Sequence, residues 1–261
     1  DRDGNVVVEL NLDQVRREAA DLAAAGVEAI AVCFLHAYKN PAHERLVRDV
    51  LVDAHPDIAI SLSSDVQPEL REYERASTTT ANAYVQPLMK RYVDRLVAAF
   101  ADQRFSGQFH LMQSAGGLVA PKTAATYPIR LLESGPAGGG LATAFFGGRV
   151  GKSDVISFDM GGTTAKACLI EDGKANVAPM LEAARVHRFK KGSGLPIKAP
   201  VIDMIEVGAG GGSIASFDKL GLLKVGPGSA GADPGPACYG RGGTEATVTD
   251  ANLLLGYLDP G

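Results

Sequence analysis

The stretch ISFDMGGTTAKACLIEDG, which runs from Ile156 to Gly173, decides how the second half of this 261-residue chain is interpreted. Apolar residues lie on both sides of a Gly-Gly turn, so the pattern predicts two short strands joined by a tight hairpin. A P-loop needs four residues between its first glycine and a Gly-Lys-Ser/Thr sequence, with a helix behind it. This stretch has neither feature, and the P-loop class is therefore excluded.

The residue types in this hairpin suit a phosphorylated ligand with magnesium. Asp159 ends the first strand, where one carboxylate is enough to hold a Mg2+ ion whose other ligands are phosphates and waters. The amides of Gly161 and Gly162 are unshielded by side chains, and consecutive amides can form an anion-binding nest. The side-chain donors that follow are Thr163, Thr164 and Lys166. The alternative is an ordinary hairpin turn with solvated threonines.

Composition excludes several classes of protein. The chain is 46% hydrophobic and 21% charged, which is typical of a globular protein. A net charge of -4 argues against nucleic acid or an anionic membrane as the main partner. No apolar run approaches the roughly 20 residues of a membrane span, and no signal peptide is evident. Three distant cysteines without a CxxC pair favour a reducing compartment, so a cytoplasmic location is expected.

The first half of the chain alternates between strand and helix patterns, which predicts an α/β fold with a parallel sheet. The expected elements are a strand at 6–10, a helix from Leu12 to the stop at Gly26, a strand within 27–36, a helix after Asn40-Pro41, and a strand at 58–63. A long helical stretch follows from Glu69 to about Gln103, which Pro87 should kink or split.

A boundary is predicted near Gly148 to Lys152, which divides residues 1–150 from 151–261, and further elements are expected on both sides of it. Short strands are predicted at 109–114 and 130–134. The sequence GPAGGGLATAFFG, residues 135–147, then predicts a helix that is weak by propensity, because each interior glycine costs about 1 kcal/mol. Its small residues indicate either close helix crossing or a ligand. Short strands should follow, and a helix near 247–256 should be capped by Thr249 or Asp250.

A second glycine cluster, VIDMIEVGAGGGSIA, spans Val201 to Ala215. It is not a dinucleotide fingerprint, because the third glycine position is Ser213 and no helix pattern follows. We expect Glu206 to be a catalytic candidate beside a loop whose amides face a substrate or nucleotide. The cofactor-binding candidates in that loop are Gly208, Gly210, Gly211 and Gly212. A tight bulged hairpin is the equal alternative.

A third glycine-rich stretch runs from Val225 to Asp250, and so long a loop is usually functional or disordered. Cys238 invites a nucleophile hypothesis, but no histidine lies near it in sequence. Arg241 and Asp250 are the better candidates for contacts with an anion, and with a metal or substrate, respectively. The basic run 187–192 is most simply a solvated loop, with contact to an anionic ligand as the alternative.

Taken together, these clusters resemble the A-type subunit of the hydantoinase/oxoprolinase family. The matching pieces occur in the order of the family from about His110 to the end of the chain: HLMQSAGG, ESGPAGG, FDMGGTTAK, IEVGAGGGSIA, and VGPGSAGADPGPACYGRGG with TVTDANLLLGYLDP. Many members have GGTSTD where this chain has GGTTAK, and MQSNGG where this chain has Ala115. The N-terminal part is more faintly similar.

The resemblance implies an actin/Hsp70/sugar-kinase-like, ribonuclease H-like fold of two lobes around an ATP cleft. By this resemblance the helix at 135–147 is the connecting helix, and Asp159 to Thr164 form the second phosphate hairpin. The first hairpin and the adenosine loop are not found, so the chain is expected to be an internal fragment of a longer protein.

The resemblance also implies an ATP- and Mg2+-dependent enzyme that phosphorylates the carbonyl oxygen of a small cyclic amide, such as a hydantoin or 5-oxoproline, before water opens the ring. The alternatives are a ketone carboxylase subunit of the same family and a non-catalytic nucleotide-binding module. A B-type hydantoinase subunit is the implied partner.

Overall fold

The computed structural model describes residues 1–184, 186 and 192–260. The chain forms two compact units. Unit 1 comprises Asp1–Ala137 and Val177–Val201, and unit 2 comprises Gly138–Asn176 and Ile202–Gly261. The first cut lies inside a helix, about ten residues before the boundary expected near Gly148. The assignment of 1–150 and 151–261 to two lobes stays a prediction.

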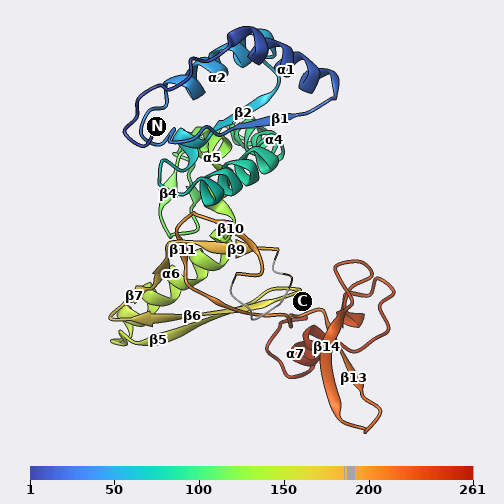
Figure 1. The fold of residues 1–261 in the computed structure, drawn as a ribbon. Coiled ribbons are helices and arrows are strands. Elements are labelled where there is room, and N and C mark those ends of the chain that lie inside the picture. The colour runs from blue at the N-terminus through green and yellow to red at the C-terminus, as the bar shows by residue number, and fades with distance from the viewer. Residues whose placement is uncertain (185, 187–191, 261) are drawn as a thin grey trace. The chain divides into compact units, whose positions relative to one another are not determined.

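Unit 1 is built around two parallel strands, β1 (Ala29–Val32) and β2 (Ala59–Leu62). Helices α1 (Leu12–Ala24) and α2 (Ala42–Ala54) lie on one side of this pair, and the long helix α4 (Glu72–Asp102) lies on the other (Figure 1). The predicted strand–helix alternation and the parallel pairing are confirmed. Pro87 lies inside α4, which continues unbroken through it.

Local signals in the sequence explain where these helices begin and end. The side chain of Asn11 accepts a hydrogen bond from the amide of Gln14, which caps α1. Gly26 follows α1 with a φ of 77°, a left-handed conformation that glycine adopts without steric cost. The Asn40 side chain accepts from the amide of Ala42 at the start of α2.

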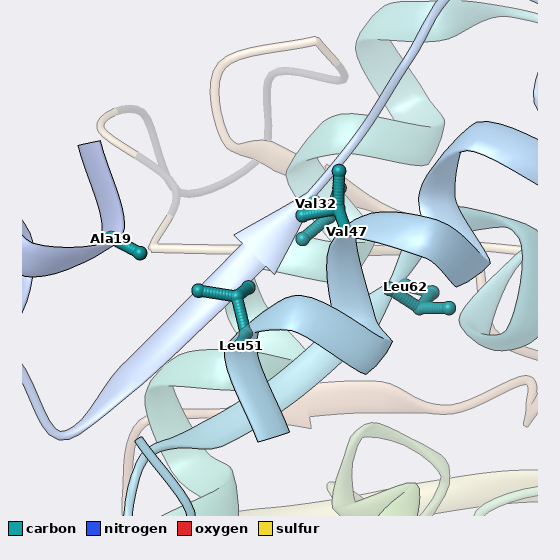
Figure 2. Close-up of a cluster of buried hydrophobic side chains, with 5 residues drawn as sticks. All are labelled: Ala19, Val32, Val47, Leu51 and Leu62. Atoms are coloured by element: carbon teal, nitrogen blue, oxygen red, sulfur yellow. The ribbon is translucent and has the colours of Figure 1, made fainter. Parts of the chain in front are cut away.

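The apolar faces of these elements form a buried cluster of Ala19, Val32, Val47, Leu51 and Leu62 (Figure 2). The side chains of Val47 and Leu51 lie one helical turn apart on α2 and share its inner face. Burying one such aliphatic side chain contributes about 1.5–3 kcal/mol. This cluster therefore holds α1 and α2 against the strands.

The rest of unit 1 consists of short elements: α3 (Ser63–Val66), β3 (Leu111–Met112), β4 (Leu118–Val119), α5 (Pro121–Thr126), η1 (Pro128–Leu131), β8 (Val177–Ala178), β9 (Leu181–Ala183) and β10 (Leu195–Ile197). β3 pairs with β4 and β9 with β10, both antiparallel. Val66, Ile129, Ile197 and Ala199 form a second buried cluster.

Two strand predictions in unit 1 are wrong. Residues 6–10 are not a strand, and Val6, Val7 and Val8 are exposed, because no strand among the described residues pairs with them. Residues 130–134 are not a strand either. Pro128 starts the 3-10 helix η1 there, and Ser134 already begins the next helix.

A buried polar network joins α2, α4 and the ends of the two parallel strands. The carboxylate of Glu44 accepts hydrogen bonds from the amides of Phe34 and Ser64 and from the hydroxyl of Ser63. The guanidinium of Arg75, which is fully buried, donates to the carbonyl of Phe34 and to the hydroxyl of Ser63. Each buried charge is thus hydrogen-bonded, as burial requires.

Unit 2 contains a four-stranded sheet made of β5 (Val155–Met160), β6 (Ala165–Glu171), β12 (Ile205–Val207) and the short β7 (Lys174–Ala175). β6 pairs antiparallel with each of the other three. Helix α6 (Ser134–Arg149) lies along β5 and β6 (Figure 1). The remaining elements are β13 (Ser213–Phe217), β14 (Leu223–Ser229), η2 (Ala237–Tyr239) and α7 (Val248–Leu254), and the chain passes from unit 1 to unit 2 within β11 (Val201–Ile202).

The prediction that Thr249 or Asp250 is the N-cap residue of α7 is wrong. Thr247, rather than Thr249 or Asp250, is the N-cap residue, and its hydroxyl accepts from the amide of Asp250. The carboxylate of Asp250 accepts in return from the amide of Thr247, so the two residues form a capping box.

Candidate functional site

The predicted hairpin of β5 and β6 is present, with Gly161 to Thr164 as its turn. The six residues of β5 pair with β6 in one unbroken register, from Val155 opposite Ile170 to Met160 opposite Ala165. The amide of Gly161 donates to the carbonyl of Thr164 over 2.9 Å and closes the turn.

Three consecutive amides at the tip of this hairpin have no acceptor in the described part of the chain. They belong to Gly162, Thr163 and Thr164. The hydroxyl groups of Thr163 and Thr164 also have no hydrogen-bond partner among the described residues. Five donors of one short segment are therefore available to an anion, as in a nest of backbone amides.

The two glycines of the turn are not explained by the fold of the turn itself. Neither Gly161 nor Gly162 has a positive φ, so the backbone conformation does not call for glycine. A Cβ atom on Gly162 would meet nothing within 4 Å, and one on Gly161 would lie 3.6 Å from the carbonyl oxygen of Thr164, an ordinary contact. Close approach of a ligand to the amides is a remaining reason for both glycines.

A row of charged residues crosses the sheet beside the turn. Lys166 on β6 lies opposite Asp159 on β5 and opposite Glu206 on β12. Directly paired residues of an antiparallel sheet have side chains on the same face, with Cβ atoms about 4.5–5.5 Å apart. The structure thus brings together three residues that the sequence separates by up to 47 positions, two acids with a lysine between them.

Helix α6 packs against the same face of the sheet through its small residues. A Cβ atom on Gly140 would lie 3.0 Å from the Sγ atom of Cys168, and one on Gly139 would lie 3.6 Å from a carboxylate oxygen of Asp159. The hydroxyl of Thr143 donates to that of Ser157 over 3.1 Å. Close approach explains Gly140, whose partner is a sheet and not the second helix that was expected, whereas a Cβ atom on Gly138 would meet nothing within 4 Å.

The second glycine cluster packs directly on the hairpin turn. The amides of Gly211 and Gly212 donate to the carbonyls of Gly161 and Gly162 over 2.9 Å and 2.8 Å. A Cβ atom on Gly210 would lie 2.6 Å from the backbone N and C atoms of Thr163, a distance that real Cβ atoms do not reach. The cluster therefore supports the hairpin from behind.

A third amide of that loop is also engaged. The amide of Gly210 donates to the hydroxyl of Ser213. Thr249 donates to the carbonyl of Gly211 through its amide, over 2.8 Å, and through its hydroxyl, over 2.9 Å. Close packing gives Gly210 to Gly212 a structural reason. The alternative of a bulged hairpin is wrong, because β12 pairs with β6 and β13 pairs with β14. A role in cofactor binding for these residues and for Gly208 stays a prediction.

The third glycine-rich loop ends in the Asp250 capping box. The carboxylate of Asp250 accepts from the amide of Cys238 over 2.7 Å as well as from Thr247. Burial would raise the pKa of Asp250, but the hydrogen bonds from the Cys238 amide and thiol and from Thr247 outweigh it and lower the pKa well below the usual range. Asp250 therefore has a structural task as a cap.

Within the described residues, neither Cys238 nor Arg241 has a partner that activates it. The hydrogen bond from the Cys238 thiol to Asp250 raises the pKa of that thiol, and burial adds to the effect. A raised pKa disfavours the thiolate that a nucleophile needs. The guanidinium of Arg241 lies 5.9 Å from the centre of the Tyr239 ring. The basic run at 187–192 lies outside the described residues except for Gly192.

Two findings about metals and membranes concern the described residues alone. Among them, no three histidine, cysteine, aspartate or glutamate side chains come together as a metal site. Residues 1–184, 186 and 192–260 also contain no helix long and apolar enough to cross a lipid bilayer.

The sequence patterns did not reveal the buried polar network of unit 1. A stripe of polar residues along α4 includes Arg75, Thr79, Asn82 and Gln86, all buried. The only available signal was the run ASTTTAN inside a long helix, where such residues are unfavourable unless they find partners. Asn82, for example, donates to Ser61 and to the carbonyl of Thr126.

Comparison with known proteins identifies the family. The model of the hydantoinase/oxoprolinase family matches residues 75–261, and that of the hydantoinase/oxoprolinase N-terminal region matches residues 1–54. The alpha subunit of caprolactamase from Pseudomonas jessenii is 40% identical over 90% of this chain and 32% of its own length. The 5-oxoprolinase of Saccharomyces cerevisiae is 38% identical over 92% of this chain and 18% of its own length.

A solved structure supports the same assignment. Nucleotide-free acetone carboxylase superposes on the whole chain with a TM-score of 0.77 and 30% identity, and 36% of the carboxylase chain is covered. The expected fold, that of the actin-like ATPases, is confirmed. The chain spans between 18% and 38% of the length of the curated relatives it matches. It belongs to the hydantoinase/oxoprolinase family.

Proposed function

We propose that the protein containing this chain uses ATP and Mg2+ to open a cyclic amide, and that the β5–β6 hairpin binds phosphate in that reaction. Relatives named caprolactamase and 5-oxoprolinase support the choice of a cyclic amide as substrate. The activity is proposed for the longer protein, since the chain spans only a part of each relative.

One observation carries the proposal. The amides of Gly162, Thr163 and Thr164 and the two threonine hydroxyls point to no acceptor in the described part of the chain. The space beside Gly161 and Gly162 is not filled by other protein atoms. Because glycine has no side chain, an anion can use this space to approach the amides. A tip of five donors on a continuously paired hairpin suits the oxygens of a phosphate group.

Each candidate residue has a distinct task in this proposal. Asp159 would hold the Mg2+ ion, while Gly161, Gly162, Thr163 and Thr164 would surround the phosphate oxygens. Lys166, which pairs in register with Asp159 and Glu206, would add positive charge beside the phosphate and hold the two acids in place. When bound, ATP supplies the phosphoryl group that turns the amide oxygen into a leaving group.

Glu206 is the second proposed catalytic residue. Its exposed side chain lies on the edge strand β12, in the same cross-strand row as Asp159. A carboxylate in this position can orient a water or accept its proton when the activated ring is opened. The loop that follows, with Gly208 and Gly210 to Gly212, would keep both the hairpin and Glu206 in register.

The experiment is to measure phosphate release from Mg-ATP by the full-length protein with its partner subunit. The reaction is run with caprolactam, with hydantoin, with 5-oxoproline, and with acetone plus bicarbonate. Release that depends on a cyclic amide is expected, and Asp159→Asn should lower it by about a hundredfold, as for other groups that stabilise transition-state charge.

Asp172→Asn is the matched control. Asp172 lies just beyond the other end of β6, is exposed, and has a φ of 50°, which asparagine tolerates. This variant should keep full phosphate release. Equal losses in the two variants would contradict a specific task of Asp159.

Two other functions are separated by the same assay. Release only with acetone and bicarbonate would assign the protein to the carboxylases, a reading favoured by the 30% identity and full coverage of this chain by acetone carboxylase. Binding of ATP without release under any condition would assign it to a non-catalytic nucleotide-binding module.

The partner is proposed on the same basis. Several relatives are named as subunits, among them the caprolactamase alpha subunit and the beta subunit of acetone carboxylase. We infer that a B-type subunit completes the enzyme. Phosphate release should then rise when that subunit is added to the purified protein, and no change on its addition would argue against the inference.

A further inference from the structure

The amides at the tip of the β5–β6 hairpin share their peptide units with carbonyl groups that the second glycine cluster holds. The carbonyl of Gly161 belongs to the same peptide unit as the amide of Gly162, and the carbonyl of Gly162 to the same unit as the amide of Thr163. Gly211 donates to the first carbonyl over 2.9 Å, and Gly212 donates to the second over 2.8 Å. Both units are trans and planar, so holding each carbonyl fixes the direction of the amide on its opposite side.

One further residue holds this arrangement from the side of helix α7. Thr249 donates twice to the carbonyl of Gly211, through its amide over 2.8 Å and through its hydroxyl over 2.9 Å. That carbonyl shares a peptide unit with the amide of Gly212. A continuous chain of hydrogen-bonded groups therefore leads from Thr249, through two peptide units, to the amide of Thr163 at the tip.

The local structure explains why Thr249 reaches this carbonyl. It is the second residue of α7, and the amides in the first turn of a helix have no acceptor within the helix. The capping box of Thr247 and Asp250 fixes that turn. A Cβ atom on Gly211 would lie 2.6 Å from the hydroxyl oxygen of Thr249, so glycine at this position is what admits the hydroxyl.

Hydrogen bonds in such a chain reinforce one another. A carbonyl that accepts a hydrogen bond makes the amide of its own peptide unit a stronger donor, because each bond polarises the next. Two donors on the carbonyl of Gly211 thus strengthen the bond from Gly212 to Gly162. The same effect, one peptide unit further along, makes the amide of Thr163 a stronger donor to an anion.

We propose that Thr249 is a positioning residue for the phosphate-binding amides of the hairpin. It acts through the peptide unit of Gly211 and Gly212 and does not touch the ligand. The inference rests on the proposed function for the identity of that ligand, whereas the hydrogen bonds that carry it lie within the protein. The rival role is structural, in which Thr249 only stabilises the fold of α7 and leaves the tip unaffected.

The first experiment is hydrogen–deuterium exchange of the full-length protein without nucleotide, followed by mass spectrometry. Thr249→Val keeps the shape of the side chain and removes the hydroxyl, whereas Thr249→Ser keeps the hydroxyl. In Thr249→Val the amides of Gly211 and Gly212 should exchange about three- to tenfold faster, because one hydrogen bond of ordinary strength is lost. Thr249→Ser should exchange like the natural sequence.

Nucleotide binding gives the second readout. In isothermal titration calorimetry with the imido analogue of ATP (AMPPNP) and Mg2+, the Kd should be about three- to tenfold higher in Thr249→Val and unchanged in Thr249→Ser. In the phosphate-release assay the KM for Mg-ATP should rise by the same factor, while kcat changes less than about twofold. A merely structural role would lower the fraction of active protein, so kcat would fall and KM would stay the same.

Thr244→Val is the matched control. Thr244 is exposed, lies just before α7, and its hydroxyl forms no hydrogen bond with the described part of the chain. This variant should match the natural sequence in all three measurements.

The proposal is overturned if Thr249→Val exchanges like the natural sequence, if Thr249→Ser is as impaired as Thr249→Val, or if kcat alone falls. If the natural sequence binds no Mg-AMPPNP, the function proposed for the hairpin fails, and the exchange experiment decides by itself whether Thr249 holds the glycine peptide unit.

Discussion

The two glycine clusters of unit 2 look equivalent in the sequence but differ in the structure. Gly210 to Gly212 are glycines because the protein leaves no room for side chains, since a Cβ atom on Gly210 would lie 2.6 Å from the backbone of Thr163. At Gly161 and Gly162, by contrast, a Cβ atom would fit without a close contact to the protein. The amides of Gly211 and Gly212 donate to carbonyl groups of the protein. The amides of residues 162–164 have no acceptor in the described chain.

This difference separates a loop that packs on the turn from a hairpin tip that we propose to bind phosphate. Two hydrogen bonds, from Gly211 to Gly161 and from Gly212 to Gly162, connect the two clusters and fix the carbonyl side of the turn. The amide side is left available for a ligand. Substitutions with alanine, which add a single Cβ atom, test the two tasks independently.

The largest effect is expected for Gly210→Ala. Its Cβ atom would overlap backbone atoms that cannot rotate away, so we expect a loss of about 3 kcal/mol in the free energy of unfolding, the upper end for overpacking. Urea unfolding of the full-length protein measures it. A loss below about 0.5 kcal/mol would mean that the loop does not pack on the turn.

Gly162→Ala is the converse test and serves as the matched control. Its Cβ atom would meet no protein atom within 4 Å, so the free energy of unfolding should change by less than about 0.5 kcal/mol. Phosphate release from Mg-ATP should nevertheless fall about tenfold or more, because the methyl group would occupy the approach to the amides. Normal release would refute the phosphate-binding role of the tip.

Two glycines of α6 extend the comparison to the helix. Gly140→Ala should destabilise the protein by about 1 kcal/mol, because its Cβ atom would lie 3.0 Å from the Sγ atom of Cys168 and overpacking outweighs the gain in helix propensity. Gly138→Ala, which meets nothing within 4 Å, should stabilise by up to about 1 kcal/mol. Thermal unfolding compares the two variants, and equal shifts would argue against packing on the sheet.

The smallest effect is expected from acid. The pKa of Asp250 is lowered in the folded protein, so its contribution to stability is complete above the unfolded pKa of about 3.9 and is lost as the pH falls below it. Asp250 caps α7, and Thr249 of this helix donates a hydrogen bond to the carbonyl of Gly211. Between pH 6 and pH 3, Asp250→Asn should therefore lose less stability than the natural sequence in urea titrations. An identical pH dependence would exclude this contribution.

Much of the fold could be read from local patterns. The helices that begin at Leu12 and Ala42 have polar caps and apolar faces at helical spacing, and the strands between them are continuous apolar runs. The strand predicted at residues 6–10 is wrong because its valines have the right propensity, but no strand in the described part of the chain pairs with them. Propensity is a property of one segment, whereas a β-strand also requires a second segment to which its backbone forms hydrogen bonds.

The candidate site could be predicted only in part for a similar reason. The hairpin from Ile156 to Gly173 was predictable because its strands and turn are adjacent in the chain. The position of Lys166 opposite Glu206 depends on the register of β12, which residues 40 positions apart determine together. The hydrogen bonds from Thr249 to Gly211 were not predicted at all, because 38 positions separate the two residues along the chain.

The sequence by itself determined the helices of the first half, the hairpin with its acidic and hydroxyl residues, and the family through motifs in a fixed order. Only the tertiary structure decided beside which glycines other protein atoms fill the space of a side chain and beside which glycines that space is left open. The physical reason is that a glycine contributes no side-chain signal of its own. Its meaning depends on what lies within about 4 Å of the absent Cβ atom, and distant parts of the chain supply those neighbours.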